Sequence, residues 1–173
     1  MAGLLKPVGL FIGRFQPFHY GHLASVKFAL QRVRQLYILV GSSQKSHEAK
    51  NPFTAGERIL MIRNALIYER INPSRFLIIP VADAVGHAVW TALIDQVVPK
   101  YDVVFSNDTL TIQLFKEKVI QTIEPPLLER AIYSATEVRR RIKSGGNWTP
   151  LVPRPVSAIV RPIVQSGRFE GLE

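Results

Sequence analysis

Short apolar segments alternate with longer amphipathic ones along most of this chain. Apolar runs of strand length lie at residues 8–12, 36–40, 76–80, 102–106 and 119–123. Between and after them, apolar residues recur at helical spacing, which predicts helices at residues 21–33, 55–69, 87–97, 109–117 and 135–144 and a last one after Pro155. This alternation predicts an α/β protein with a Rossmann-like, doubly wound parallel sheet and a small C-terminal helical appendage.

The expected parallel sheet also indicates where a ligand binds. In an open parallel sheet, ligands bind beyond the carboxyl ends of the strands, at the point where the strand order reverses. We therefore expect the loops after the first four strands to converge. The length of 173 residues fits one domain, so residues 1–173 are interpreted as a single domain.

The charge of the chain indicates an anionic partner. Lys and Arg number 22 and Asp and Glu 13, a net charge of +9. The basic residues are scattered except at 139–141, and a small phosphorylated substrate explains that cluster as well as a nucleic acid does. Cysteine is absent, which excludes disulfides and thiolate metal sites. No apolar run is long enough to span a bilayer and residues 1–8 do not resemble a secretion signal, so the expected location is cytoplasmic.

The segment from Gly13 to His22 lies between the first predicted strand and the first predicted helix. His19 and His22 are three residues apart at the helix entrance, which places both imidazoles on one side, where their N–H groups can hold phosphate oxygens. Gly13 and Gly21 lack a Cβ, so a ligand can approach the backbone closely. Two alternatives remain: a plain turn, or a metal site completed by other residues, for which the spacing specifies no ligand set.

The loops after the second and third predicted strands are also polar. Residues 41–47 carry hydrogen-bond donors at nearly every position and Lys50 follows them, although a solvated surface loop has the same composition. Asp83 lies at the end of the third strand. Trp90 follows on the next helix, where it could belong to the core or stack on a flat ring, and a positively charged ring would gain most.

Residues 133–141 predict a helix with hydroxyl groups at its start and three arginines inside. Ser134 or Thr136 can cap the helix or bind a phosphate together with the free N–H groups. Successive arginines point in different directions on a helix, so at most two of them face one ligand. A capped surface helix with solvated charges is the alternative.

With these segments in view, the chain resembles a nucleotidyltransferase superfamily that has an H-x-G-H element near its N-terminus and an S-x-T-x-x-R element near its C-terminus. Residues 19–22 and 134–139 supply these two elements. More narrowly, the chain resembles the archaeal nicotinamide-nucleotide adenylyltransferases through residues 13–19, 44–47, 51–58, Trp90 and 151–153. One departure is the segment 106–111, S-N-D-T-L-T, where the family often has S-G-N-P-L-V. It leaves the loop shape and any adenine contact there open.

The resemblance implies transfer of AMP from ATP to nicotinamide mononucleotide (NMN), giving NAD and pyrophosphate by direct in-line attack. It implies Mg²⁺ held mainly by the ATP phosphates, no metal ligands from the protein, and a hexamer, with no nucleic acid or membrane as partner. The implied catalytic residues are Arg14, His19, His22 and Arg139. The implied ATP-binding residues are Gly13, Phe15, Gln16, Gly21, Ser134, Thr136 and Arg140. The implied NMN-binding residues are Ser42, Lys45, Lys50, Asp83 and Trp90.

Three other functions remain open on sequence grounds. The first is the same fold with another phosphorylated acceptor, such as phosphopantetheine or a choline-type phosphate. The second is a basic nucleic-acid-binding module, which predicts salt-dependent binding to DNA or RNA without nucleotide addition. The third is a protein that binds NAD without turnover.

Overall fold

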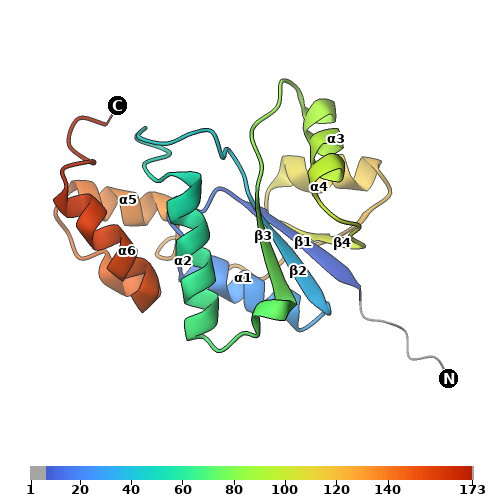
Figure 1. Cartoon of the computed structure of the whole chain (residues 1–173), viewed down its shortest axis with the longest axis horizontal. Helices are drawn as coiled ribbons and strands as arrows, with labels where there is room; N and C mark the ends of the chain where they lie inside the picture. The colour runs from blue at the N-terminus through green and yellow to red at the C-terminus, as the bar shows by residue number, and fades with distance from the viewer. Residues whose placement is uncertain (1–6, 173) are drawn as a thin grey trace.

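A computed structural model describes residues 7–172, which contain a five-stranded parallel sheet. Figure 1 shows this sheet with helices beside it. Its strands are β1 (Val8–Gly13), β2 (Gln35–Val40), β3 (Phe76–Pro80), β4 (Val103–Phe105) and β5 (Gln121–Ile123). They follow the order β3-β2-β1-β4-β5, and every neighbouring pair is parallel. The strand order therefore reverses between β1 and β4, which confirms the predicted doubly wound sheet.

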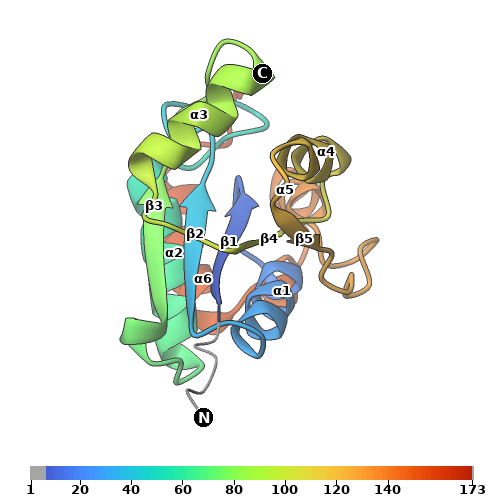
Figure 2. The same ribbon diagram turned by 90° about the vertical axis from the view of Figure 1, so that its right-hand side faces the viewer.

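Six α-helices and two short 3₁₀ helices connect or follow the strands in the described residues. The α-helices are α1 (Tyr20–Leu30), α2 (Ala55–Tyr68), α3 (His87–Val97), α4 (Thr109–Glu117), α5 (Ala135–Lys143) and α6 (Arg154–Gln165). The 3₁₀ helices are η1 (Pro73–Arg75) and η2 (Thr149–Leu151). Figure 2 shows that helices lie on both sides of the sheet. None of the described helices is long and apolar enough to cross a membrane.

Several predicted boundaries differ from the structure by one to three residues, and two of these differences have a clear local reason. The fifth strand begins at Gln121 instead of residue 119, because Val119 has a φ of 59° and cannot continue an extended backbone. The last helix begins at Arg154, one residue before Pro155. A proline in the first turn of a helix loses no intrahelical hydrogen bond, so it marks the helix start without preventing it.

The sheet separates two apolar core clusters. On β2, Leu36, Ile38 and Val40 belong to one cluster, and Tyr37 and Leu39 belong to the other, as the alternation of side chains along a strand requires. Residues of α1, α2, α5 and α6 complete the first cluster, and residues of α3 and α4 complete the second. Because both faces are covered, the strands read as continuous apolar runs.

The predicted C-terminal helices pack into the main core. Val156 and Val160 of α6 are fully buried in the first cluster, and α6 packs against α2. Beyond α6, Arg168 binds both carboxylate oxygens of Glu57 at 2.8 and 2.6 Å. Glu57 also forms a capping box with Thr54 at the start of α2. The C-terminal segment therefore helps to fix the start of α2.

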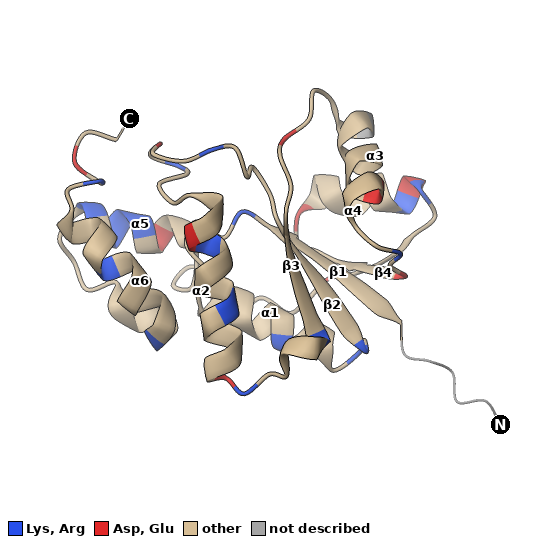
Figure 3. Cartoon of the chain, in the orientation of Figure 1, with Lys and Arg blue, Asp and Glu red and all other residues tan. Residues whose placement is uncertain are grey.

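Basic residues occur on most elements of the fold instead of forming one tract. Figure 3 shows Lys and Arg on α1, α2, α5, α6 and several loops, with acidic residues between some of them. On α5, Glu137 pairs with both Arg140 and Arg141, at 2.7 and 2.8 Å. The surplus of positive charge is therefore spread over the surface, as the sequence indicated.

Candidate active site

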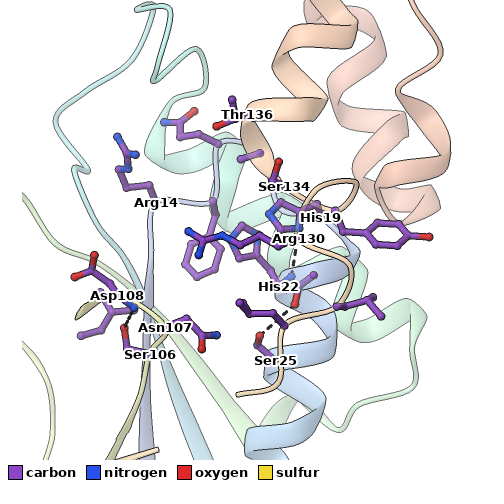
Figure 4. Close-up of a pocket in the computed structure, with 18 of the residues that line it drawn as sticks. Arg14, His19, His22, Ser25, Ser106, Asn107, Asp108, Arg130, Ser134 and Thr136 are labelled. Atoms are coloured by element: carbon purple, nitrogen blue, oxygen red, sulfur yellow. Dashed lines mark hydrogen bonds between the residues drawn. The ribbon is translucent and has the colours of Figure 1, made fainter. Parts of the chain in front are cut away.

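A cavity of about 470 Å³ lies at the carboxyl edge of the sheet, where the strand order reverses. Figure 4 shows side chains from the loop after β1, from the loop after β4 and from the start of α5 around this cavity. Its polar and charged lining comprises Arg14, Gln16, His19, His22, Ser25, Ser106, Asn107, Asp108, Thr109, Arg130, Tyr133, Ser134, Thr136 and Arg139. The two sequence motifs, more than a hundred residues apart, thus meet in one site.

The two histidines of the first motif stack on each other. Their ring centroids are 3.7 Å apart and the planes are inclined by 29°. His19 also caps α1, because its Nδ1 accepts a hydrogen bond from the backbone N–H of His22 at 3.4 Å. An Nδ1 that accepts leaves the proton of the neutral ring on Nε2. His19 can therefore donate one hydrogen bond to an anionic ligand.

Both imidazoles are neutral at physiological pH. Burial, and then the positive charge of Arg139, lower the pKa of His19 from 6.5 to about 4. Burial, and then His19, lower the pKa of His22 well below its ordinary value. Phe15 and Phe18 enclose the His22 ring, and its Nδ1 is buried without a partner among the described residues. Such an unpaired nitrogen beside the cavity is suited to a water or a ligand oxygen.

These shifts predict how stability depends on pH. Because the folded chain holds His19 neutral while the unfolded chain protonates it below pH 6.5, the stabilisation is complete above pH 6.5 and is lost as the pH falls towards 4. We expect the free energy of unfolding to fall by about 2 kcal/mol between pH 7 and 5 from His19 alone. Urea unfolding at both pH values measures this. An equal fall in the free energy of unfolding of the His19→Asn variant, which lacks the titratable ring, would contradict this expectation.

Arg139 joins the two motifs. Its Nη1 donates to the backbone oxygen of Gln16 at 2.7 Å, and its Nη2 lies 3.4 Å from Oγ1 of Thr136. Burial, and then the charge of Arg14, lower the pKa of Arg139, but a guanidinium stays protonated at neutral pH. Arg14 and Arg139 therefore place two positive charges beside the neutral histidines. Neither has a carboxylate within ion-pair distance among the described residues.

Arg130 adds a third positive charge that sequence reasoning missed. It lies in the irregular segment between β5 and α5 and lines the same cavity as Arg14 and Arg139. A single basic residue outside a helix or strand has no periodicity or spacing to mark it. Only its position after the fifth strand of the sheet could have indicated that it lies near the site.

Three helices begin at the cavity. Residues at the starts of α1, α4 and α5 line it, so the positive ends of three helix dipoles lie near one volume. Ser134 caps α5 by accepting from the N–H of Glu137 at 3.2 Å, as predicted. Asp108 caps α4 by accepting from Thr111 at 2.8 Å. The departure from the family pattern at 106–111 therefore still gives a capped helix that borders the cavity.

The two glycines of the first motif make room for the protein's own atoms at the site. A Cβ on Gly13 would lie 2.8 Å from the Phe15 ring. A Cβ on Gly21 would lie 2.9 Å from the His19 ring and 2.9 Å from the backbone oxygen of Tyr133. The glycines therefore allow the Phe15 and His19 rings to pack tightly at the site.

Two predicted ATP-binding side chains have other partners. The side-chain amide of Gln16 is buried; its Oε1 accepts from the N–H of Phe53 and its Nε2 donates to the C=O of Phe53, both at 2.9 Å. Arg140 does not line the cavity, because its exposed guanidinium makes two hydrogen bonds to Glu137 at 2.7 and 2.8 Å. Gln16 instead fixes the segment before α2 to the motif that holds the histidines.

The loops after β2 and β3 form a second cluster, which we call the β2–β3 cluster: Ser42, Gln44, Lys45 and Asp83. The Asp83 carboxylate accepts from Ser42 at 2.8 Å and from Gln44 at 3.1 Å, and Lys45 lies at 3.3 Å. Burial raises the pKa of Asp83, but the hydrogen bonds from Ser42 and Lys45 outweigh it and keep that pKa below its ordinary value. The β2–β3 cluster does not line the cavity, so the first four loops converge only in part.

Trp90, predicted to recognise the acceptor, does not line the cavity. Its ring packs against Phe115 of α4 at a centroid distance of 6.3 Å and lies against the second core cluster. The large apolar ring is partly buried between α3 and α4, which explains the position. Lys50 is exposed and does not line the cavity either.

The described residues contain no group of three or more His, Cys, Asp or Glu side chains that could hold a metal ion. Asp108 is the one carboxylate among the described residues that line the cavity. The site therefore offers many donors and cations for an anion, and few ligands for a cation.

A cationic cavity at the switch point of a doubly wound sheet is typical of nucleotide-binding α/β proteins. Comparison with known families identifies this chain as a nucleotidyltransferase. The model of the family described as cytidylyltransferase-like matches residues 10–141. The chain is 47% identical over 148 residues to the nicotinamide-nucleotide adenylyltransferase of Saccharolobus solfataricus, covering 86% of each protein. It is 46% identical to that of Methanosarcina acetivorans, over 88% of this chain and 87% of that protein. The chain therefore belongs to the nicotinamide-nucleotide adenylyltransferase family.

Solved structures confirm the fold. The bifunctional NMN adenylyltransferase/ADP ribose pyrophosphatase of Francisella tularensis, complexed with AMP and a Mn ion, aligns with a TM-score of 0.80 at 24% identity. A second structure of that protein aligns with a TM-score of 0.81 at 23% identity, over 97% of this chain. This chain spans about half the length of that protein, 52% in both cases.

Proposed function

We propose that this chain transfers the adenylyl group of ATP to the 5′-phosphate of NMN, forming NAD and pyrophosphate. The observation that carries this proposal is the convergence of two neutral histidines, three arginines and three helix N-termini on one cavity. Such a set of donors matches the charge of a triphosphate. The choice of NMN as acceptor is supported by the names of the relatives and not by the cavity itself.

The proposed reaction is a single displacement at the α-phosphorus of ATP. An oxygen of the acceptor phosphate forms a bond to the α-phosphorus, while the bond from the α-phosphorus to the bridging oxygen of the β-phosphate breaks. The bonding electrons leave with pyrophosphate. No protein nucleophile is required, so the work of the site is positioning and stabilisation of charge.

The described contacts suggest how the residues share this work. His19, with its proton on Nε2, donates to the α-phosphate, and the orphaned Nδ1 of His22 lies beside the same group. Arg14 and Arg139 neutralise the charge that develops on the departing pyrophosphate, and Arg139 is held for this by the backbone oxygen of Gln16. The start of α5, with Ser134 and Thr136, holds the same phosphates through its free N–H groups.

The proposed reaction takes a divalent cation that arrives with the nucleotide, because the cavity itself offers few ligands for one. A Mg²⁺ ion usually keeps several waters and binds through substrate phosphates and one or two carboxylates, and Asp108 is the carboxylate available in the lining. When bound, the ion offsets part of the triphosphate charge. The protein side chains supply the remaining positive charge through Arg14, Arg130 and Arg139.

The acceptor is proposed to lie over the ends of β2 and β3. The backbone N–H of Gly41 binds the backbone oxygen of Gly13 at 2.9 Å, so the loop that carries Ser42 and Lys45 runs beside the loop that carries the histidines. The β2–β3 cluster offers the polar groups of Ser42, Lys45 and Asp83 to the acceptor.

A pyrophosphate-release assay with ATP, Mg²⁺ and a panel of phosphorylated acceptors tests the proposal. The panel includes NMN, nicotinate mononucleotide, phosphopantetheine and choline phosphate. We expect release only with the pyridine mononucleotides, matched one to one by dinucleotide formation. Pyrophosphate release only with a non-pyridine acceptor would overturn NMN as the acceptor, but it would leave the proposed adenylyl transfer in place.

A further inference from the structure

Arg58, in the first turns of α2, is the largest fully buried side chain among the described residues, with an exposed fraction of 0%. Its guanidinium binds four backbone carbonyls. Nε donates to Thr54 at 3.2 Å, and Nη1 donates to Arg14 at 2.9 Å and to Gly41 at 2.7 Å. Nη2 donates to Ser42 at 3.1 Å. One side chain thus holds the loop after β1, the loop after β2 and the start of α2.

This buried charge has no carboxylate within ion-pair distance among the described residues. Burial, and then the charge of Arg14, lower its pKa, while Asp83 and Glu57 act in the opposite direction. Burying an unpaired charge is costly, so such a residue needs a compensating role. A rigid planar fork with five donors can fix two neighbouring loops relative to each other, which a flexible ammonium or an apolar side chain cannot do.

The two loops that Arg58 joins have different parts in the proposed function. The loop after β1 carries Arg14 and the histidines, which face ATP, whereas the loop after β2 carries Ser42, which binds Asp83 at 2.8 Å. We propose that Arg58 is a positioning residue that sets the spacing between the ATP-binding and acceptor-binding halves of the site. This inference rests on the proposed adenylyl transfer, because only a reaction between two bound substrates requires that spacing.

Binding of the dinucleotide product measures the spacing directly. NAD occupies both halves at once, so its affinity depends on the affinity of each half and on how well their separation matches the linked ligand. AMP and NMN each occupy one half and do not sense the separation. A substitution that changes only the spacing weakens NAD binding and leaves AMP and NMN binding nearly unchanged. A substitution that merely lowers the folded fraction changes the stoichiometry but no dissociation constant.

We expect Arg58→Lys to raise the Kd of NAD about tenfold and those of AMP and NMN by less than about threefold. Arg58→Met is expected to show a larger loss for NAD, and if it fails to fold, Arg58→Lys alone decides. Arg75 offers a matched control. Its guanidinium also binds three backbone carbonyls, those of Leu30, Val33 and Arg34, but at the amino end of the sheet. Arg75→Lys should leave all three dissociation constants unchanged.

Isothermal titration of the wild type and the variants with AMP, NMN and NAD gives these values. An unchanged Kd for NAD in Arg58→Lys would overturn the inference, and so would equal losses for NAD and both mononucleotides. A wild-type chain that binds none of the three ligands would instead overturn the proposed function. The two failures are therefore distinguishable.

Discussion

Replacement of His19 by alanine is expected to lower kcat of the proposed transfer by about a hundredfold or more, which is typical of removing one preorganised transition-state donor. The ring of His19 is neutral, with its pKa lowered to about 4 by burial and then by Arg139, and its Nδ1 is occupied by the N–H of His22. The remaining Nε2–H is therefore fixed as a donor before substrate arrives. Steady-state kinetics with saturating ATP and NMN measure the loss.

A second His19 variant and a control histidine separate hydrogen-bond donation by His19 from other roles of its ring. His19→Asn keeps a side-chain N–H at the position and should retain more activity than His19→Ala. His87→Ala serves as a control, because His87 is exposed at the start of α3 and does not line the cavity. An unchanged kcat in His19→Ala, with the fold intact by circular dichroism, would remove His19 from the mechanism.

Arg139→Met is expected to lower kcat/KM for ATP by about a hundredfold to a thousandfold, because it removes one of the positive charges that face the leaving group. Arg139 is also held in place, since it donates to the backbone oxygen of Gln16 at 2.7 Å. Arg139→Lys keeps the charge but cannot reproduce the planar fork. We therefore expect an intermediate loss in Arg139→Lys, mainly in kcat.

The neighbouring residue provides the matched control. Arg140 has the same side chain on the same helix, but it is exposed and bound to Glu137 outside the cavity. Arg140→Met should change kcat/KM by less than about twofold, as expected of a surface substitution. Equal losses in the Arg139 and Arg140 variants would mean that the general charge of α5, and not the geometry of Arg139, supports the reaction.

The order of the elements and the location of the site could be predicted because both follow from local sequence. Continuous apolar runs reflect strands covered on both faces, and the parallel order brings their carboxyl ends to one edge. His19 lies where a predicted strand gives way to a predicted helix, and Ser134 lies at a helix start that a short-range capping pattern reveals. These features need no knowledge of which distant segments touch.

Contacts between distant segments could not be predicted in the same way. Gln16 lies in a motif that handles phosphate, yet its amide is occupied by the backbone of Phe53, 37 residues away. Trp90 follows the third strand, yet it packs on Phe115 because α3 and α4 share one face of the sheet. Arg58 reads as an ordinary charge on an amphipathic helix, and only the tertiary fold shows that it is buried.

In the proposed mechanism, a cavity of fixed donors and cations transfers the adenylyl group directly, without a covalent bond to the protein. Stereochemistry at the α-phosphorus tests it most directly. With ATP made chiral at that atom by a sulfur substitution, a single in-line displacement by NMN inverts the configuration. The proposed mechanism predicts a thio-substituted NAD of inverted configuration. Retention would require two displacements, with the adenylyl group bound to the protein between them, and would contradict it.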